Sequence, residues 1–315
     1  MILAADDPRL LLTGHAELLR EDGRLVPVRL PRGYADPGLT AAAAVPAGVR
    51  LAFDSDATGF EWDATSSAAP FDVVVDGELV LRSRETPLRV SGLVLGRKRF
   101  EIWLPQLGHV RLGPLRLPGG AVVAPPAIRP QWTAYGSSIT QCTGADGPSE
   151  TWPALVASAN DWTLRCLGFA RQCHLDPVVA RLIRDTPADL ISLCVGTNIH
   201  GAASFSARTL APALTGFVRT IRDGHPDTPL AVLSPPVAPD RERAANAVGL
   251  TLADVRAEVE SAVRALQKDD PALTLVPGPE IADAAWLADG VHPSADGYRR
   301  MAGRLTPVLG GLITC

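Results

Sequence analysis

The stretch Trp-Thr-Ala-Tyr-Gly-Ser-Ser-Ile-Thr, residues 132–140, decides how the larger part of this chain folds. Its first residues, Trp132–Tyr135, form a short run typical of a buried strand, and Gly136 and Ser137 then mark a turn. Further runs of this kind follow along the chain and are separated by stretches with helical periodicity. Strands that alternate with helices indicate a parallel sheet covered by helices on both faces.

This α/β pattern begins near residue 128. After the first strand, the predicted strands are residues 163–166, 190–195, 230–234 and 273–276. The predicted helices are residues 151–160, 175–185, 206–223, 246–268 and 294–308. In the fourth of these helices, apolar residues recur three or four positions apart and form one face.

Residues 1–127 have a different character, because short apolar runs alternate there with turn signals and show little helical periodicity. The predicted strands are residues 25–30, 49–53, 71–75, 100–104, 109–112 and 115–117. Many short strands separated by Gly and Pro indicate a β-sandwich. We therefore predict a β-sandwich domain over 1–127 and an α/β domain over 128–315.

Composition excludes several classes of protein. The 315 residues are 46% hydrophobic and 20% charged, with a net charge of −4 and dispersed Lys and Arg. This pattern is typical of a globular protein and predicts neither a nucleic-acid partner nor a membrane partner. The first residues lack the basic segment of a secretory signal, which predicts a cytoplasmic protein, or a secreted one if a signal peptide was removed.

The five cysteines are odd in number and contain no Cys-x-x-Cys pair, so free thiols are the favoured interpretation. Cys142 and Cys173 follow neighbouring predicted strands, and a disulfide between them stays open as an alternative. A metal site at Cys173, His174 and Asp176 is disfavoured because no second ligand pair accompanies it. We predict no metal and no cofactor.

Polar residues and a glycine follow three of the predicted strands. Ser138 comes after the first strand, Gly168 after the second and Asn198 after the third. The carboxyl ends of parallel strands meet at one edge of a sheet, where ligands bind. These three positions, distant in the sequence, are therefore expected to converge.

A serine hydroxyl becomes an effective nucleophile only beside a base whose tautomer is fixed by a third group. His292 is the candidate base and Asp289, three residues earlier, the candidate partner. Attack on an ester also requires hydrogen-bond donors for the oxyanion, and the candidates are the Ser138 N–H, the Gly168 N–H and the Asn198 amide. Taken singly, each residue also has an ordinary interpretation as a turn, cap or loop residue.

The order Ser138, Gly168, Asn198, Asp289 and His292 resembles that of the SGNH hydrolases, the GDSL-type esterase superfamily. The resemblance covers about 128–310 and implies a doubly wound, flavodoxin-like parallel sheet with these five residues in the roles named above. The N-terminal β-sandwich also resembles the layout of two-domain carbohydrate esterases.

Two motifs depart from the family pattern. The usual Gly-Asp-Ser-Leu reads Gly-Ser-Ser-Ile over 136–139, and the usual Gly-x-Asn-Asp reads Gly-Thr-Asn-Ile over 196–199. Neither departure removes a catalytic atom.

Together these observations predict a serine carboxylester hydrolase that removes short acyl groups, such as acetyl, from a sugar or small metabolite through an acyl-enzyme. Ser137, Arg171, His174 and His200 are predicted pocket residues. The alternatives are an acyltransferase that uses the same site and a non-catalytic carbohydrate-binding protein on the same fold.

Overall fold

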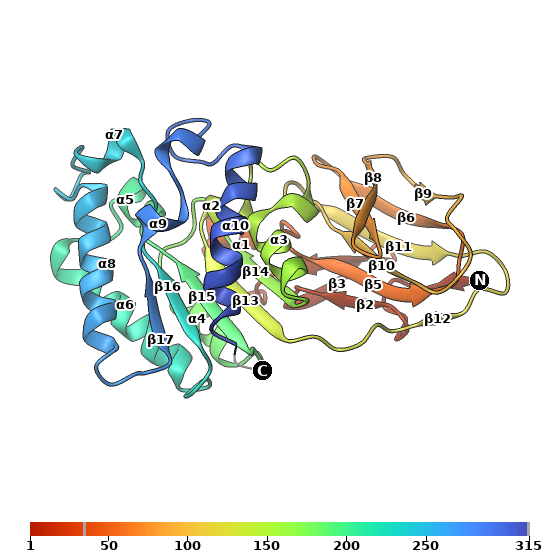
Figure 1. Ribbon diagram of the computed structural model, residues 1–315, viewed down its shortest axis with the longest axis horizontal. Helices are drawn as coiled ribbons and strands as arrows, with labels where there is room; N and C mark the ends of the chain where they lie inside the picture. Colours follow the sequence, from red (N-terminus) through yellow and green to blue (C-terminus); the bar gives the residue numbers. More distant parts are fainter. Residues whose placement is uncertain (34–35, 314–315) are drawn as a thin grey trace.

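The computed structural model describes residues 1–33 and 36–313, and its two parts lie end to end along the longest axis (Figure 1). One part contains two antiparallel sheets, and the other contains a five-stranded parallel sheet with helices. The antiparallel strands run from Ile2 to Ala124, and the parallel sheet begins at Gln131. The predicted fold class, a β-sandwich followed by a doubly wound α/β domain, is confirmed.

The sandwich packs its two sheets around an apolar core. One sheet has the order β3-β4-β11-β6-β9 with β1 on β11, and the other has the order β12-β5-β10-β7-β8 with β2 on β5. The strands are β1 (Ile2–Leu3), β2 (Leu11–Thr13), β3 (Glu17–Glu21), β4 (Arg24–Val28), β5 (Arg50–Ser55), β6 (Phe60–Ser66), β7 (Phe71–Val75), β8 (Glu78–Ser83), β9 (Leu88–Val90), β10 (Lys98–Trp103), β11 (Val110–Arg116) and β12 (Val123–Ala124). Buried Phe53 and Phe100 stack at a centroid distance of 4.8 Å in this core.

The parallel sheet has the order β14-β13-β15-β16-β17, which is the flavodoxin-like 2-1-3-4-5 arrangement. Its strands are β13 (Gln131–Gly136), β14 (Thr163–Gly168), β15 (Leu190–Cys194), β16 (Leu230–Leu233) and β17 (Leu273–Val276). The helices are α1 (Pro37–Ala43), α2 (Ser138–Gln141), α3 (Trp152–Ala159), α4 (Pro177–Arg184), α5 (Thr197–Ala202), α6 (Ala207–Arg222), α7 (Pro239–Glu242), α8 (Leu252–Leu266), α9 (Gly278–Ile281) and α10 (Ala295–Gly310), with 3₁₀ turns η1 (Pro148–Glu150) and η2 (Ala284–Trp286).

The two faces of the parallel sheet carry separate cores, because successive strand residues point to opposite sides. Tyr135 and Leu193 pack with residues of α4, α6 and α8. Trp132 and Ala134 pack with residues of α3 and α10 on the other side. Among the described residues, no helix is both long enough and apolar enough to cross a membrane.

The sandwich contributes side chains to the cores of the α/β domain. Val74 and Trp103 pack in one of them, and Leu39 of α1 packs in the other. Arg29 is fully buried at this joint, and its guanidinium donates to the carbonyl oxygens of Cys166 at 3.0 Å and Gly168 at 2.7 Å. The two parts are therefore docked through shared packing.

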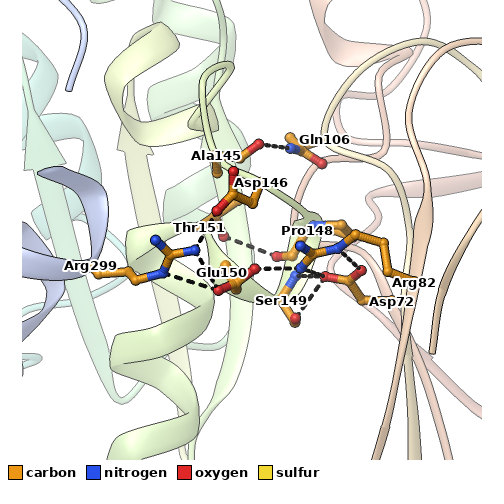
Figure 2. A network of polar contacts seen from close by, with 10 residues as sticks. All are labelled: Asp72, Arg82, Gln106, Ala145, Asp146, Pro148, Ser149, Glu150, Thr151 and Arg299. Carbon is orange, nitrogen blue, oxygen red and sulfur yellow. Dashed lines mark hydrogen bonds and ion pairs between the residues drawn. The ribbon is translucent and has the colours of Figure 1, made fainter. Parts of the chain in front are cut away.

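A second polar joint lies beside η1. Figure 2 shows Arg82 reaching from the sandwich, and Arg299 from α10, toward the same Glu150 carboxylate. Arg82 also pairs with the buried Asp72 at 2.7 Å, and Asp72 accepts from both the N–H and the hydroxyl of Ser149. This network connects the sandwich to both the segment that follows α2 and the last helix.

Candidate active site

The nucleophile candidate lies on a tight turn between β13 and α2. A Cβ at Gly136 would come within 2.1 Å of Thr140 Oγ1, so only glycine permits this turn. Ser137 is the N-cap, and its hydroxyl accepts from the Ile139 N–H at 3.2 Å. Ser138 is the first residue of α2 and is 6% exposed.

The base candidate, His292, lies in the loop before α10 and contacts Ser138. Its Nε2 is 2.7 Å from Ser138 Oγ, and its Nδ1 is 2.7 Å from Asp289 Oδ2. The other oxygen of Asp289 accepts from the backbone N–H groups of His292 at 2.7 Å and Val291 at 3.0 Å. Ser294 caps α10 directly afterwards by accepting from the Gly297 N–H, which anchors the loop.

The Asp289 carboxylate is held in its charged form. The His292 backbone N–H, followed by the His292 ring and the Val291 N–H, lowers the pKa of Asp289 to about 2. A charged carboxylate accepts the Nδ1–H of His292, which leaves Nε2 without a proton and able to accept one from Ser138. The three predicted residues thus form one continuous hydrogen-bonded chain.

Asn198 is the second residue of α5. Its Oδ1 accepts from the Cys173 N–H at 3.1 Å, so the side-chain amide is fixed and its NH₂ group stays free to donate. Asn198 and Ser138 line the same cavity. The Ser138 N–H is the first of α2 and belongs to the donors that a helix leaves without an internal partner.

Gly168 lies at the carboxyl end of the second parallel strand, where it pairs with Gly136 of β13. It ends β14 and does not line the cavity that contains Ser138. A Cβ there would lie 2.4 Å from Gln141 N, so the glycine lets α2 pack directly on the strand. This close approach explains why a glycine is needed at position 168, and its role as an oxyanion donor stays a prediction.

The cavity at Ser138 has a volume of about 510 Å³. It is lined by Ser138, Thr143, Ala170, Arg171, Thr197, Asn198, Gly201, Ala202, Arg241, Val291 and His292. Of the predicted pocket residues, only Arg171 lines it. Arg241 was not predicted, because α7 is a short helix after β16 that carries no recognisable motif.

The remaining predicted pocket residues have structural contacts instead. Ser137 caps α2, and His200 is buried, with its Nε2 3.2 Å from the Ala244 carbonyl oxygen. His174 bonds through Nε2 to the Arg171 carbonyl oxygen and through Nδ1 to the Ser204 hydroxyl. His174 therefore braces the loop of Arg171 from outside the cavity.

The cysteines are free thiols in the part of the chain that the structure describes, and Cys315 lies outside it. The alternative disulfide between Cys142 and Cys173 does not form, because the two thiols pack in cores on opposite faces of the sheet. Within residues 1–33 and 36–313, no three His, Cys, Asp or Glu side chains gather as a metal site would require.

Sequence and structure comparisons bear directly on this site. A profile of the GDSL-like lipase/acylhydrolase family matches residues 134–300. The chain belongs to this family. The match spans the segment from β13, just before Ser138, into α10, just after His292, and it makes the protein a serine ester hydrolase by family. A search of curated protein sequences finds no match.

Solved structures match over the whole chain, including the sandwich. The salicylyl-acyltransferase SsfX3 from a tetracycline biosynthetic pathway is 33% identical with a TM-score of 0.90, and the match covers 99% of this chain and 97% of that one. A protein from Bacteroides ovatus described as GDSL-like lipase is 19% identical with a TM-score of 0.81 over the same shares. A family two carbohydrate esterase from Cellvibrio japonicus is 19% identical with a TM-score of 0.70, covering 99% and 98%. At these lower identities, the likeness shows the fold.

Proposed function

We propose that this protein hydrolyses short-chain carboxylic esters through an acyl-enzyme on Ser138. The observation that carries the proposal is the chain of contacts from Ser138 Oγ to His292 Nε2 and from His292 Nδ1 to Asp289, each 2.7 Å long. This is the arrangement by which a weak hydroxyl nucleophile is activated at neutral pH. A buried serine beside a cavity of about 510 Å³ suits an ester of modest size.

In the proposed reaction, Ser138 Oγ attacks the ester carbonyl carbon while His292 Nε2 takes the hydroxyl proton. Asp289 stabilises the resulting imidazolium and keeps its ring oriented. The Ser138 N–H and the Asn198 amide donate to the oxyanion. The tetrahedral intermediate collapses, and the C–O bond to the alcohol breaks as His292 returns the proton to the leaving oxygen. Water, deprotonated by His292, then attacks the acyl-enzyme and releases the carboxylic acid and Ser138.

The proposed substrates are esters of short acyl groups, acetyl included, with a sugar or a small metabolite as the alcohol. The family assignment supports ester chemistry. Structural neighbours include family two carbohydrate esterases and an acetyl xylan esterase, which share the fold with this chain. The non-catalytic alternative is disfavoured because the Ser138–His292–Asp289 chain is intact.

Acyl transfer to an alcohol is the second candidate function. The observation that favours it is the 33% identity to a salicylyl-acyltransferase over nearly the whole length of both chains. The same acyl-enzyme serves both outcomes, because an acceptor hydroxyl can take the place of water in the second half of the reaction.

The test uses 4-nitrophenyl esters of increasing acyl length with wild type, Ser138→Ala and Ser137→Ala. We expect Ser138→Ala to lower kcat by at least roughly 1,000-fold, because only binding and the oxyanion donors remain. Ser137→Ala removes only the α2 cap, so its expected effect is a loss of about 1 kcal/mol in stability with most of kcat retained. Adding small alcohols separates ester formation from hydrolysis, and mass spectrometry of a rapidly quenched reaction locates the acyl group. An active Ser138→Ala enzyme would disprove the assignment.

A further inference from the structure

The charged side chains that line the cavity around Ser138 include arginines but no carboxylates. Arg171, on the loop after β14, and Arg241, in α7, both line it. No Asp or Glu is among the lining residues. The two arginines come from segments that are far apart in the sequence, so the fold brings two cations to the place where an ester would bind.

Neither guanidinium has an acidic partner among the described residues. Within residues 1–33 and 36–313, no ion pair or side-chain hydrogen bond involves Arg171 or Arg241, although most arginines there are paired. Glu242, next to Arg241 in α7, is occupied by Arg256 at 2.7 Å and also accepts from the Ala238 N–H. Asp240, the other carboxylate beside Arg241 in the sequence, forms no ion pair among the described residues, so neither adjacent carboxylate pairs with Arg241.

Arg171 is presented from a braced backbone. Its φ of 65° lies in the left-handed region that residues other than glycine rarely adopt, and it is held there by neighbours on both sides. The Ala170 N–H donates to Gln141 Oε1 at 3.0 Å, and His174 Nε2 bonds the Arg171 carbonyl oxygen at 2.9 Å. These contacts thus fix the backbone of Arg171 beside the cavity.

We infer that the substrate carries an anionic group, a carboxylate or a phosphate, which Arg171 and Arg241 recognise. Guanidinium groups bind these anions through paired, charge-assisted hydrogen bonds, and an unpaired guanidinium loses no existing partner when it does so. The inference rests on the proposed ester chemistry and narrows it. It makes both arginines specificity-determining residues, outside the proton-transfer chain of Ser138, His292 and Asp289.

Two ester pairs test this with the full-length protein. Each pair contains a carboxylate and its methyl ester: 4-nitrophenyl hemisuccinate carries the charge in the acyl part, and 4-acetoxybenzoate carries it in the alcohol part. One of the two pairs places its carboxylate where Arg171 and Arg241 can bind it. For that pair, we expect kcat/KM of the anionic ester to exceed that of its neutral methyl ester by about tenfold or more. This preference should shrink when ionic strength rises from roughly 0.05 to 0.5 M.

Variants assign the preference to the arginines. Arg171→Gln and Arg241→Gln are each expected to lower the ratio of anionic to neutral kcat/KM about tenfold, with partial recovery in the Lys variants. Arg84→Gln is the matched control, because Arg84 is exposed in the sandwich and lines no part of this cavity. The ratio in that variant should equal that of wild type.

Calorimetry with Ser138→Ala makes the inference independent of turnover. We expect 4-acetoxybenzoate or the hemisuccinate to bind more tightly than its methyl ester, and the difference to disappear when both arginines are changed to Gln. Neutral esters turned over as well as anionic ones, with equal binding, would overturn the anionic substrate and leave the esterase intact. Tighter anion binding without any turnover would instead refute the ester chemistry alone.

Discussion

At the scale of single residues, the charge of Asp289 in the hydrogen-bonded chain Ser138–His292–Asp289 follows from its pKa. Its pKa is lowered to about 2 from 3.8, chiefly by the His292 backbone N–H. Because the pKa of Asp289 is lower in the folded protein than in the unfolded chain, its ionised carboxylate stabilises the fold at pH values above the unfolded pKa. This stabilisation is lost as the pH falls through the folded pKa of about 2. Between pH 4 and 8 the carboxylate therefore stays charged.

Asp289→Asn should consequently lower kcat strongly at pH 7 to 8. We expect a loss of about 100- to 10,000-fold, because an amide cannot hold the imidazole in the tautomer that leaves Nε2 free. The measurement is the ratio of wild-type to variant kcat at several pH values from 4 to 8. The ratio at pH 7 to 8 is the decisive value, and a ratio near one there would contradict the role given to Asp289.

Residues whose side chains take part in the chemistry could be predicted from the sequence better than residues that matter through packing or position. Ser138, Asn198, Asp289 and His292 were predictable, because parallel strands bring their carboxyl ends to one edge and the structure places all four around one cavity or in contact with it. The contact of Gly168 with α2 was not predictable, because a glycine that donates its N–H and one that admits a neighbouring helix are the same residue in the sequence. Arg241 was also beyond reach, since nothing local marks an arginine that faces a distant serine.

At the scale of elements, the contact between β14 and α2 sets the position of Ser138. A methyl group at Gly168 would lie 2.4 Å from Gln141 N and 2.7 Å from Thr140 C, and both are backbone atoms that cannot rotate away. Gly168→Ala should therefore displace α2, lower stability by about 1–3 kcal/mol and reduce kcat. Urea unfolding and esterase assays measure the two effects.

Gly303→Ala is the control for this prediction. Gly303 lies in α10, and nothing lies within 4 Å of the position its Cβ would take. Alanine favours a helix over glycine by about 1 kcal/mol, so this variant should be as stable as wild type or more so, with normal activity. Equal behaviour of the two alanine variants would contradict the role given to Gly168.

The elements found from the sequence are those with enough length to show a period. All the predicted parallel strands and the five longer helices are present, with ends shifted by a few residues. The predicted helix 246–268 starts only at Leu252, because Thr251 and Asp254 form a capping box and Asn246 closes a turn before it. The short helices α2, α5, α7 and α9 span four to six residues, too few for a 3.6-residue period to appear.

At the scale of the whole molecule, Arg29 connects the sandwich to the sheet. Burial lowers the pKa of Arg29 to about 10, so it remains charged at neutral pH. Its guanidinium donates to the carbonyl oxygens of Ala42, Val45, Cys166 and Gly168. Arg29→Met keeps much of the apolar volume but leaves these buried acceptors without their donor.

We expect Arg29→Met to lower the free energy of unfolding by at least about 3 kcal/mol, as the loss of one partner in a buried charged network does. Arg84→Met, at an exposed position of the sandwich, should change it by less than about 0.5 kcal/mol. Denaturant unfolding of both variants measures the difference. An unchanged midpoint for Arg29→Met would show that the joint contributes little to stability.

The packing between the sandwich and the α/β domain also limits how the two parts can evolve separately. Side chains of the sandwich complete both cores of the α/β domain, and Arg29 satisfies carbonyl groups of β14. A recombination event that replaced only one part would expose apolar surface and strand acceptors on the other, so selection should preserve the two as a single unit. The full-length match to SsfX3, which covers 99% of this chain, has the extent expected of descent with both parts together.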